Sequence, residues 1–560
     1  WWRRGPSVAR RAQPSRGAPD AAPDVALELV VVGGGTTGLC LSLILASSFL
    51  GRKRVRIYDS RWARRGDAVR WQPDAERSAQ VVTLESSVWE LLPEDVQRRV
   101  FPPDGFYEQW PRQEDGFGPS RNLSLCDLED RLLEAVQEPT YADVVQLETA
   151  TYDAEEHSRV ATKEPFHALA LADGPDACHV RDELLEGLFG SGVEYSESNQ
   201  GEILGITFDL GSEGGLNVAA CTALSLSQRR YLLNMSDGRR GLISMRLAPD
   251  ECEEADVLDG ATSSYNGSGK LWRRVLEGMK FFGVPQGALR SVTRLRSQFR
   301  HRGRYHVELD IPAAEALPRP FAFLLGDAAD AVNLWPGRGL NTALKGSDSL
   351  ANLLVCVGQS LRSGWPVSGT FFTEHAEAML QLQAKEAEVC LRHTPYPLRL
   401  QLAQAWNDEF DGPEGQDSEQ DLQVVVATAQ HCCEKLHVAG LPPAREAELP
   451  SAEELEHNLR SAGLEAETLR LLRQTGAWEV DPLLSALGPL QAQSLPKASP
   501  KTAQRATTEP AIASTKSEVG GATAASSGDG RQSKSVGART WFNRGVRALK
   551  DKETEKDEAE

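Results

Sequence analysis

The stretch from Leu29 to Asp59 constrains the fold more than any other part of the chain. Residues 29–32 are apolar and mostly β-branched, which is typical of a strand buried on both faces. Glycines then follow in the G-x-G-x-x-G spacing and lead into a helix-length apolar segment. Residues 54–58 predict a second strand, which ends at Asp59. This order predicts a βαβ unit of the Rossmann type.

Each glycine of the motif has its own expected role. Gly33 allows a tight turn from strand to helix, Gly35 lets a pyrophosphate approach the backbone, and Gly38 lets the helix pack closely on the strand. The helix N-terminus offers N–H groups and a positive dipole end to the phosphates. Asp59 stands about 20 residues beyond the last glycine, where a carboxylate accepts hydrogen bonds from an adenosine ribose. Because a carboxylate repels a 2′-phosphate, the unit suits FAD or NAD rather than NADP.

Two other interpretations of this stretch compete with a dinucleotide site. A single G-x-G-x-x-G motif can occur by chance, but the strand, helix and acid around it favour the site. Residues 29–50 hold no charged residue and are long enough to cross a bilayer. The three consecutive glycines and the hydroxyl residues among them favour two buried elements instead, so we expect no membrane span.

The composition limits the classes of partner. The chain of 560 residues is long enough for two or three domains, and its net charge of −19 disfavours nucleic-acid or anionic-membrane binding. The nine cysteines form no C-x-x-C pair and no zinc spacing, which indicates a reducing intracellular compartment without a structural metal. The cytoplasm is the simplest location. The chain begins with Trp1, and residues 1–19 hold five arginines and no acid. This segment is either a remnant of an organelle transit peptide or a disordered basic arm.

The region after residue 190 changes in character. Strand-like pieces separated by turn signals extend to about residue 309, with one expected helix near residues 271–281, and predict a mostly antiparallel domain inserted into the first. Residues 398–487 are helical in character, with a capping box at Ser451 and Glu454. Residues 491–538 contain no aromatic residue and are expected to be disordered. The basic amphipathic piece at 541–550 is either a contact for a protein partner or a membrane, or an inert terminus.

A second glycine motif, Gly326-Asp327, follows a short apolar strand at residues 321–325, about 290 residues after the first. A site for NAD alone needs no such element, whereas FAD extends away from its ADP end. An Asp at the end of a strand can accept a hydrogen bond from a ribityl hydroxyl. The segment from Pro336 to Asn341 then opens another helix, whose N-terminal dipole would stabilise negative charge on a reduced flavin.

The order of these motifs resembles the FAD-dependent aromatic hydroxylase family, the group A flavoprotein monooxygenases. The resemblance covers roughly residues 25–389. The glycine fingerprint at 33–38, the Gly-Asp motif at 326–329 and the stretch 336–341 resemble the family's motifs, although one residue is missing between Pro336 and Gly337. The dipeptide Trp335-Pro336 resembles, more loosely, the MICAL-type monooxygenases.

The family's middle motif, an Asp-Gly followed by Ser and Arg, is matched in part. Asp173-Gly174 and Arg181 agree with it, but Cys178 stands where Ser is usual and one extra residue precedes it. Asp-Gly is also a common turn pair. In the family this motif contacts both FAD and NAD(P)H. Because it is matched only in part here, the resemblance implies NAD(P)H as a co-substrate less firmly than FAD.

The resemblance implies a monooxygenase. NAD(P)H would reduce FAD, O2 would add to give a flavin C4a-hydroperoxide, and one oxygen atom would enter a small organic substrate. The inserted domain should exclude water from such an intermediate. Two alternatives stay open: a flavin oxidoreductase that inserts no oxygen, and a flavin-containing interaction protein that recruits partners through its C-terminal region and tail.

The expected fold class is α/β: a Rossmann-like FAD-binding domain with an inserted, mostly antiparallel β substrate domain, a helical C-terminal region and a disordered tail. The expected boundaries are a basic arm at 1–24, the FAD-binding domain at 25–95, 119–188 and 318–395, a substrate-side loop at 96–118, the substrate domain at 189–317, the helical region at 396–490 and the tail at 491–560.

The expected cofactor-binding residues come from the motifs and from Arg77, an arginine placed to reach the pyrophosphate. They are Gly33, Gly34, Gly35, Thr37, Gly38, Asp59, Arg77, Asp173, Gly326, Asp327, Pro336, Gly337, Gly339, Leu340 and Asn341. No catalytic acid or base follows from the sequence. His167, His179, His301 and His306 are candidates by residue type only, and each is more simply a structural or surface histidine.

Overall fold

The computed structural model describes residues 26–48, 52–75, 77, 80–108, 120–174, 195–212, 214–247, 251–302, 305–311, 319–329, 338–363, 367, 370–393, 418–438 and 450–475. All of them belong to one compact unit, Trp1–Gln493. The second unit, Ser494–Glu560, lies outside the described residues, as do the predicted basic arm and tail.

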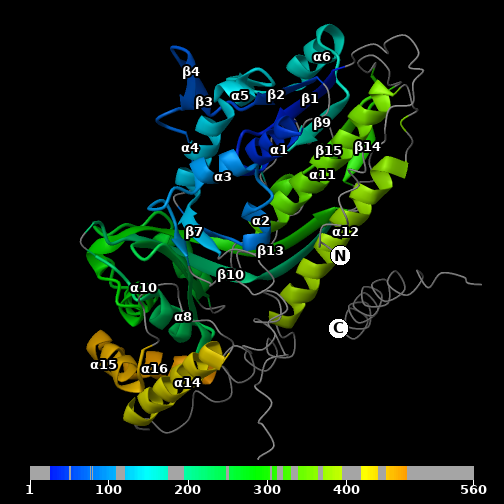
Figure 1. Ribbon diagram of the computed structural model, residues 1–560. Helices are drawn as coiled ribbons and strands as arrows, with labels where there is room; N and C mark the ends of the chain where they lie inside the picture. The colour runs from blue at the N-terminus through cyan, green and yellow to red at the C-terminus, as the bar shows by residue number, and fades with distance from the viewer. Residues whose placement is uncertain are drawn as a thin grey trace, which may run out of the picture. The chain divides into compact units, whose positions relative to one another are not determined.

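A largely parallel sheet organises the first half of the structure (Figure 1). Within the described residues it has six strands, in the order β14 (His306–Glu308), β15 (Phe321–Leu324), β9 (Ala168–Leu171), β1 (Leu27–Val32), β2 (Lys53–Tyr58) and β8 (Val145–Glu148). All neighbours pair in parallel except β14, which is antiparallel to β15. Residues 304–309 read as a further strand of the inserted region, which is wrong, because β14 pairs with β15 of this sheet.

Strand β1 is buried on both faces, as its apolar sequence predicted. Leu29 and Val31 pack into a core with helices α1 (Thr36–Ser47), α4 (Leu125–Val136) and α11 (Arg338–Arg362). Val30 and Val32 face a second core, which contains residues of α6 (Ala154–Lys163) and α12 (Thr370–His393). The alternation follows from the two-residue period of a strand.

The inserted region forms an antiparallel sheet, which confirms the pattern in the sequence. Its order is β11 (Tyr231–Ser236), β12 (Arg240–Arg246), β10 (Tyr195–Asp209) and β13 (Leu289–Arg302). The described helices of this region are α8 (Val218–Leu226), α9 (Cys252–Leu258) and α10 (Lys270–Phe281), followed by the 3₁₀ turn η2 (Gln286–Ala288). The expectation of one helix was wrong: α8 is apolar almost all round and shows no helical period, and α9 has only seven residues.

Smaller elements connect the two sheets. Strands β3 (Trp62–Arg65) and β4 (Ala68–Trp71) form a hairpin, and β5 (Val81–Leu84), β7 (Arg121–Ser124) and β6 (Tyr107–Glu108) form a three-stranded sheet. The short helices are α2 (Ser86–Trp89), α3 (Glu94–Val100) and α5 (Pro139–Ala142). Asn122 Nδ2 of β7 donates to the Ser236 carbonyl at 2.7 Å, and Asp127 of α4 pairs with Arg240 at 2.9 Å, so β7 and α4 each make one polar contact with the antiparallel sheet.

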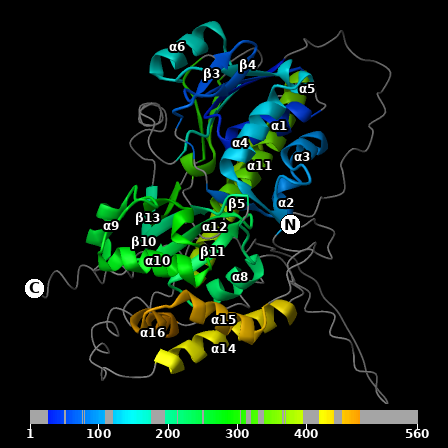
Figure 2. The same ribbon diagram turned by 90° about the vertical axis from the view of Figure 1, so that its left-hand side faces the viewer.

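The C-terminal helices belong to the core of the antiparallel-sheet region. They are α14 (Ser418–Val438), α15 (Ala452–Ala462) and α16 (Ala466–Thr475). Leu422, Leu455 and Leu472 lie in one apolar cluster with Leu204 and Val275 of the sheet and α10. Figure 2 shows the three helices beside α8 and α10. Helix α15 begins with the predicted capping box, since Ser451 and Glu454 bond each other's backbone N–H.

The described residues include no helix long and apolar enough to cross a membrane. They also include no group of three or more His, Cys, Asp or Glu side chains arranged to hold a metal ion.

A buried histidine beside β15 predicts a pH dependence of stability. Ser349 Oγ lies 2.9 Å from His375 Nδ1, and burial, reinforced by the charge of His306, lowers the pKa of His375 to about 4. Below about pH 6.5 His375 binds a proton in the unfolded chain but not in the folded chain. The stability that the neutral His375 contributes is therefore fully present above pH 6.5 and is lost as the pH falls towards 4. The loss amounts to about 3 kcal/mol.

Between pH 7 and pH 4, the free energy of unfolding of His375→Gln should therefore fall by about 3 kcal/mol less than that of the parent. Urea unfolding at several pH values measures both. The exposed His457 on α15 provides the control, because His457→Gln should leave the pH profile unchanged. Identical slopes for the parent and His375→Gln would contradict the assignment.

Candidate functional site

Three turns meet at one edge of the parallel sheet. They follow β1 at Gly33, β9 at Asp173 and β15 at Gly326, and these three strands are adjacent and parallel. The chain runs from β1 to β2 on one side and later returns to β9 on the other, so this edge lies at a topological switch point. Ligands of open α/β sheets bind in the crevice at such a point.

Most of the first glycine motif is required by packing. A Cβ on Gly33, whose φ is +101°, would lie 2.3 Å from the Ala172 carbonyl oxygen. A Cβ on Gly38 would lie 2.0 Å from the Gly33 carbonyl oxygen, and one on Gly34 would lie 2.0 Å from the ring of the buried Trp62. Glycine at 33, 34 and 38 is therefore explained by the fold itself.

Gly35 differs from the other glycines of the motif. It has an ordinary φ of −74° and stands immediately before α1. A Cβ there would meet only the far ends of two charged side chains, Glu129 Oε1 at 3.5 Å and Arg61 Nη2 at 3.6 Å. Packing leaves room for a side chain at 35, so the close contacts that require glycine at 33, 34 and 38 do not require it here.

Asp59 ends β2 beside this turn, as predicted, and its carboxylate is almost fully buried. It accepts hydrogen bonds from the Gly34 N–H at 2.8 Å and from the Arg61 backbone N–H at 2.9 Å. The Arg61 guanidinium adds Nε at 3.0 Å and Nη2 at 2.6 Å. The carboxylate thus stands where a ribose could bond it, and Arg61 engages it in this structure.

Arg77 lies against α4 and near the same edge. Its Nη2 donates to the Cys126 carbonyl at 2.6 Å, its Nη1 pairs with Asp130 at 2.9 Å, and its Nε lies 3.3 Å from Glu129. Burial raises the pKa of Glu129, and the charges of Arg61 and Arg77 oppose that rise. The two guanidiniums therefore offset part of the negative charge of Glu129 beside Gly35.

The hairpin β3–β4 covers these charges with an indole. The guanidinium carbons of Arg61 and Arg77 lie 5.0 Å and 4.4 Å from the centre of the Trp71 ring, and Trp62 contacts Trp71 edge to face. Cations over an indole face are stabilised by the ring quadrupole.

The Gly326 turn reaches the same helix as the first motif. Gly326 has a φ of +59°, and a Cβ on it would lie 2.9 Å from Oγ1 of Thr37 in the first turn of α1. The 3₁₀ turn η3 (Gly326–Ala328) begins there, and the exposed Asp327 follows at the sheet edge. Two motifs nearly 290 residues apart in the chain are therefore in contact at one edge.

The third motif has a structural role where it is described. Pro336 and Gly337 lie outside the described residues, while Gly339 and Leu340 begin α11 and are half-buried. The buried Asn341 donates to the Thr83 carbonyl at 2.8 Å and accepts from the Glu85 N–H at 2.9 Å. Its amide fastens α11 to the β5–α2 turn, and cofactor binding by Asn341 stays a prediction.

Two of the candidate histidines, His167 and His306, have described side chains, and both make structural contacts. His167 precedes β9, at the opposite end from Asp173, and its Nδ1 accepts from the Glu28 N–H at 3.0 Å. His306 stacks on Phe323 and Phe372. His179 and the side chain of His301 lie outside the described residues, as do Cys178 and Arg181 of the middle motif.

The sequence analysis missed Arg61, Trp71 and Glu129. None of them belongs to a motif, and they meet only because the hairpin and α4 fold over the Gly35 turn. One signal is present in the sequence: Glu129 adjoins an apolar face with helical spacing, made by Leu128, Leu132 and Leu133, and a carboxylate beside such a face has to find partners.

No family model matches the chain, and no curated protein matches it. Solved structures of similar fold include the Diels-Alderase PyrE3, with 16% identity over 76% of this chain and 82% of that one and a TM-score of 0.41. The p-nitrophenol 4-monooxygenase PnpA from Pseudomonas putida DLL-E4 has 13% identity over 78% and 97%, with a TM-score of 0.41. A 2-methyl-3-hydroxypyridine-5-carboxylic acid oxygenase has 14% identity over 72% and 96%, with a TM-score of 0.38.

Two of these three structures are named as oxygenases.

Proposed function

We propose that the chain is an FAD-dependent monooxygenase that uses NAD(P)H and O2 to insert one oxygen atom into a small organic substrate. The observation that supports it best is the meeting of three turns, Gly33, Asp173 and Gly326, at one sheet edge. NAD would need only the first turn, which would hold its ADP portion. FAD would extend from that turn across the other two.

The residues at this edge fit an FAD molecule in several respects. Gly35 leaves its side of α1 open, Asp59 would bond the adenosine ribose, and Arg77 pairs with Glu129 near the same turn. Asp327 is exposed beyond Gly326, where a ribityl hydroxyl would be bonded. FAD supplies the redox and oxygen chemistry when bound, and the protein supplies binding, orientation and exclusion of water.

The antiparallel sheet is the proposed substrate domain. It is tied to β7 through Asn122–Ser236 and to α4 through Asp127–Arg240, and Val81 of β5 packs against Leu242 of β12. Contacts of this kind position an inserted domain so that it can keep water from the reacting atoms.

Gly35→Ala tests the cofactor site. Because a methyl group fits at 35 without a clash, the variant should stay folded, with a change in stability of about 1 kcal/mol or less. The same methyl group would obstruct a diphosphate at the α1 N-terminus and should weaken FAD binding about tenfold to a hundredfold. The two measurements are urea unfolding of the apoprotein and titration of the apoprotein with FAD.

The reaction class needs a second measurement on the flavin-loaded protein. A monooxygenase should consume NAD(P)H and O2 together, faster with a substrate from an aromatic panel, and should release little hydrogen peroxide. NAD(P)H-independent reduction of the flavin by a substrate would indicate an oxidoreductase without oxygen insertion. Failure of the apoprotein to take up FAD would refute the proposal.

A further inference from the structure

The hydrogen bonds of Asp59 leave no acceptor site for a ribose. An ionised carboxylate offers about four lone-pair directions. Here Oδ1 accepts from the backbone N–H and Nε of Arg61, and Oδ2 accepts from the Gly34 N–H and from Nη2 of Arg61. Two ribose hydroxyls can bond this carboxylate only if the Arg61 guanidinium gives up its two bonds.

The same guanidinium stands where a diphosphate would approach. Its Nη2 lies 3.6 Å from the position of a Cβ on Gly35, the glycine that packing leaves open. The Arg61 side chain is 36% exposed, so its head can turn towards solvent without disturbing the core. Glu129, whose Oε1 lies 3.5 Å from the same Cβ position, is compensated in part by both Arg61 and Arg77.

These contacts point to an exchange of counter-ions, and this inference rests on the proposed function. We propose that Arg61 pairs with Asp59 when the site is empty and with the ligand's diphosphate once a ribose occupies Asp59. A guanidinium suits both partners, since it binds carboxylate and phosphate through charge-assisted, two-pronged hydrogen bonds. Arg61 would thus be a positioning residue that favours adenosine ligands carrying a diphosphate over those without one.

The exchange predicts opposite effects of one substitution on two ligands. In Arg61→Gln, Asp59 is released for the ribose, so adenosine should bind about tenfold more tightly than to the parent. ADP-ribose also finds Asp59 free in this variant, but its diphosphate loses the Arg61 guanidinium as a counter-ion. It should therefore bind about tenfold more weakly than to the parent. Apoprotein is titrated with ADP-ribose by calorimetry and with adenosine by ligand-observed NMR.

Arg65→Gln is the matched control, because Arg65 is an exposed arginine of the same hairpin with no recorded contact to Asp59 among the described residues. It should change neither affinity by more than about twofold. Asp59→Asn should weaken both ligands, which shows that both use the carboxylate.

The outcomes separate the two proposals. If the parent binds FAD and ADP-ribose but Arg61→Gln moves both affinities in one direction or in neither, the exchange is refuted and the cofactor site stands. If the parent binds no adenosine ligand, both proposals are refuted.

Discussion

Replacing Glu251 by glutamine should destabilise the antiparallel-sheet region by about 3–5 kcal/mol. Glu251 accepts two hydrogen bonds from Arg230 Nη2, at 2.7 and 2.8 Å, and lies 3.5 Å from Arg274 Nε. All three side chains are less than 9% exposed. Glutamine would remove the negative charge from between two buried guanidiniums and present an amide N–H to a donor.

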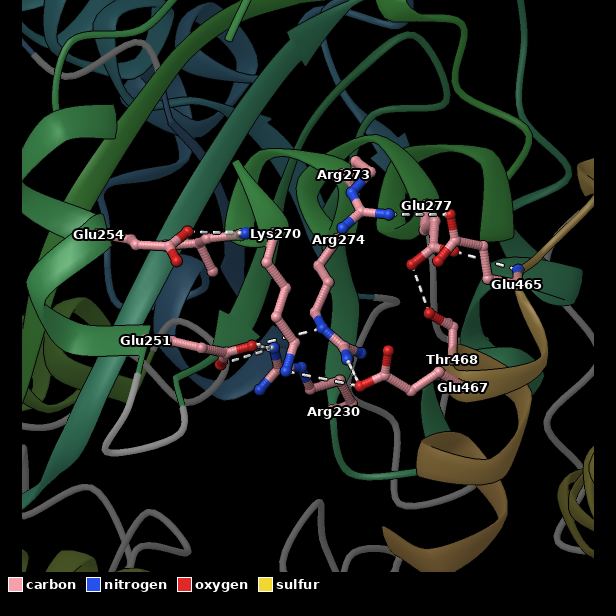
Figure 3. A network of polar contacts seen from close by, with 11 residues as sticks. Arg230, Glu251, Glu254, Lys270, Arg273, Arg274, Glu277, Glu465, Glu467 and Thr468 are labelled. Carbon is pink, nitrogen blue, oxygen red and sulfur yellow. Dashed lines mark hydrogen bonds and ion pairs between the residues drawn. The ribbon is translucent and has the colours of Figure 1, made fainter. Parts of the chain in front are cut away.

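The other carboxylates near Arg230 and Arg274 already have partners and cannot replace the charge of Glu251 (Figure 3). Arg274 and Glu277 both lie on α10. Arg274 Nη2 donates to Glu467 of α16 at 2.6 Å, and Glu277 accepts from the Thr468 hydroxyl and from the Glu465 N–H. Arg230 Nε, Arg274 Nε and Arg274 Nη1 are buried without a hydrogen-bond partner among the described residues. Buried charges in such a network are costly when one partner is removed.

Urea unfolding followed by circular dichroism measures the loss, and amide exchange should show faster opening of α10 and α16. Glu465→Gln is the control, since Glu465 and Arg273 are 53% and 57% exposed and such a pair contributes about 1 kcal/mol or less. The double variant Arg230→Met/Glu251→Leu should recover much of the loss, because apolar replacement of a buried pair is often neutral. A stability for Glu251→Gln within about 1 kcal/mol of the parent would contradict a buried charge network at this position.

Gly33→Ala should destabilise the parallel-sheet region by at least about 3 kcal/mol. Alanine would have to adopt a φ of +101° and place its Cβ 2.3 Å from the Ala172 carbonyl oxygen. That oxygen belongs to the backbone directly after β9, so it cannot move away without disturbing the pairing of β1 with β9.

Gly35→Ala provides the comparison within the same motif, because its Cβ would make only ordinary contacts. Denaturation of the two apoproteins should therefore separate a glycine required by the fold from one required by a ligand. Equal stabilities for the two variants would show that the close approach to Ala172 is relieved by a small movement.

Local patterns were sufficient for much of the fold. The buried strand, the glycine turn, α1, β2 and the capping box of α15 were all predicted correctly. Each of these elements is dictated within fewer than about fifteen residues by side-chain period, backbone freedom or capping chemistry. The same holds for the short apolar strand before Gly326.

Contacts between distant segments could not be predicted in this way. The C-terminal helices appeared as a separate helical region, yet they complete the core of the antiparallel sheet and share its buried arginine network. Likewise, β14 reads as one more strand of the inserted region and pairs instead with β15. Apolar periodicity shows that a face is buried but does not identify the partner.

Sequence alone is enough to specify the βαβ unit and its glycine turn, because both depend on the steric demands of a few consecutive residues. Only the tertiary structure decided that Gly326 meets Thr37 and that Arg61, Arg77 and Glu129 surround Gly35. These groups come from strands, a hairpin and a helix that are far apart in the chain, and only the packing of the whole sheet brings their charges within a few ångströms of one another.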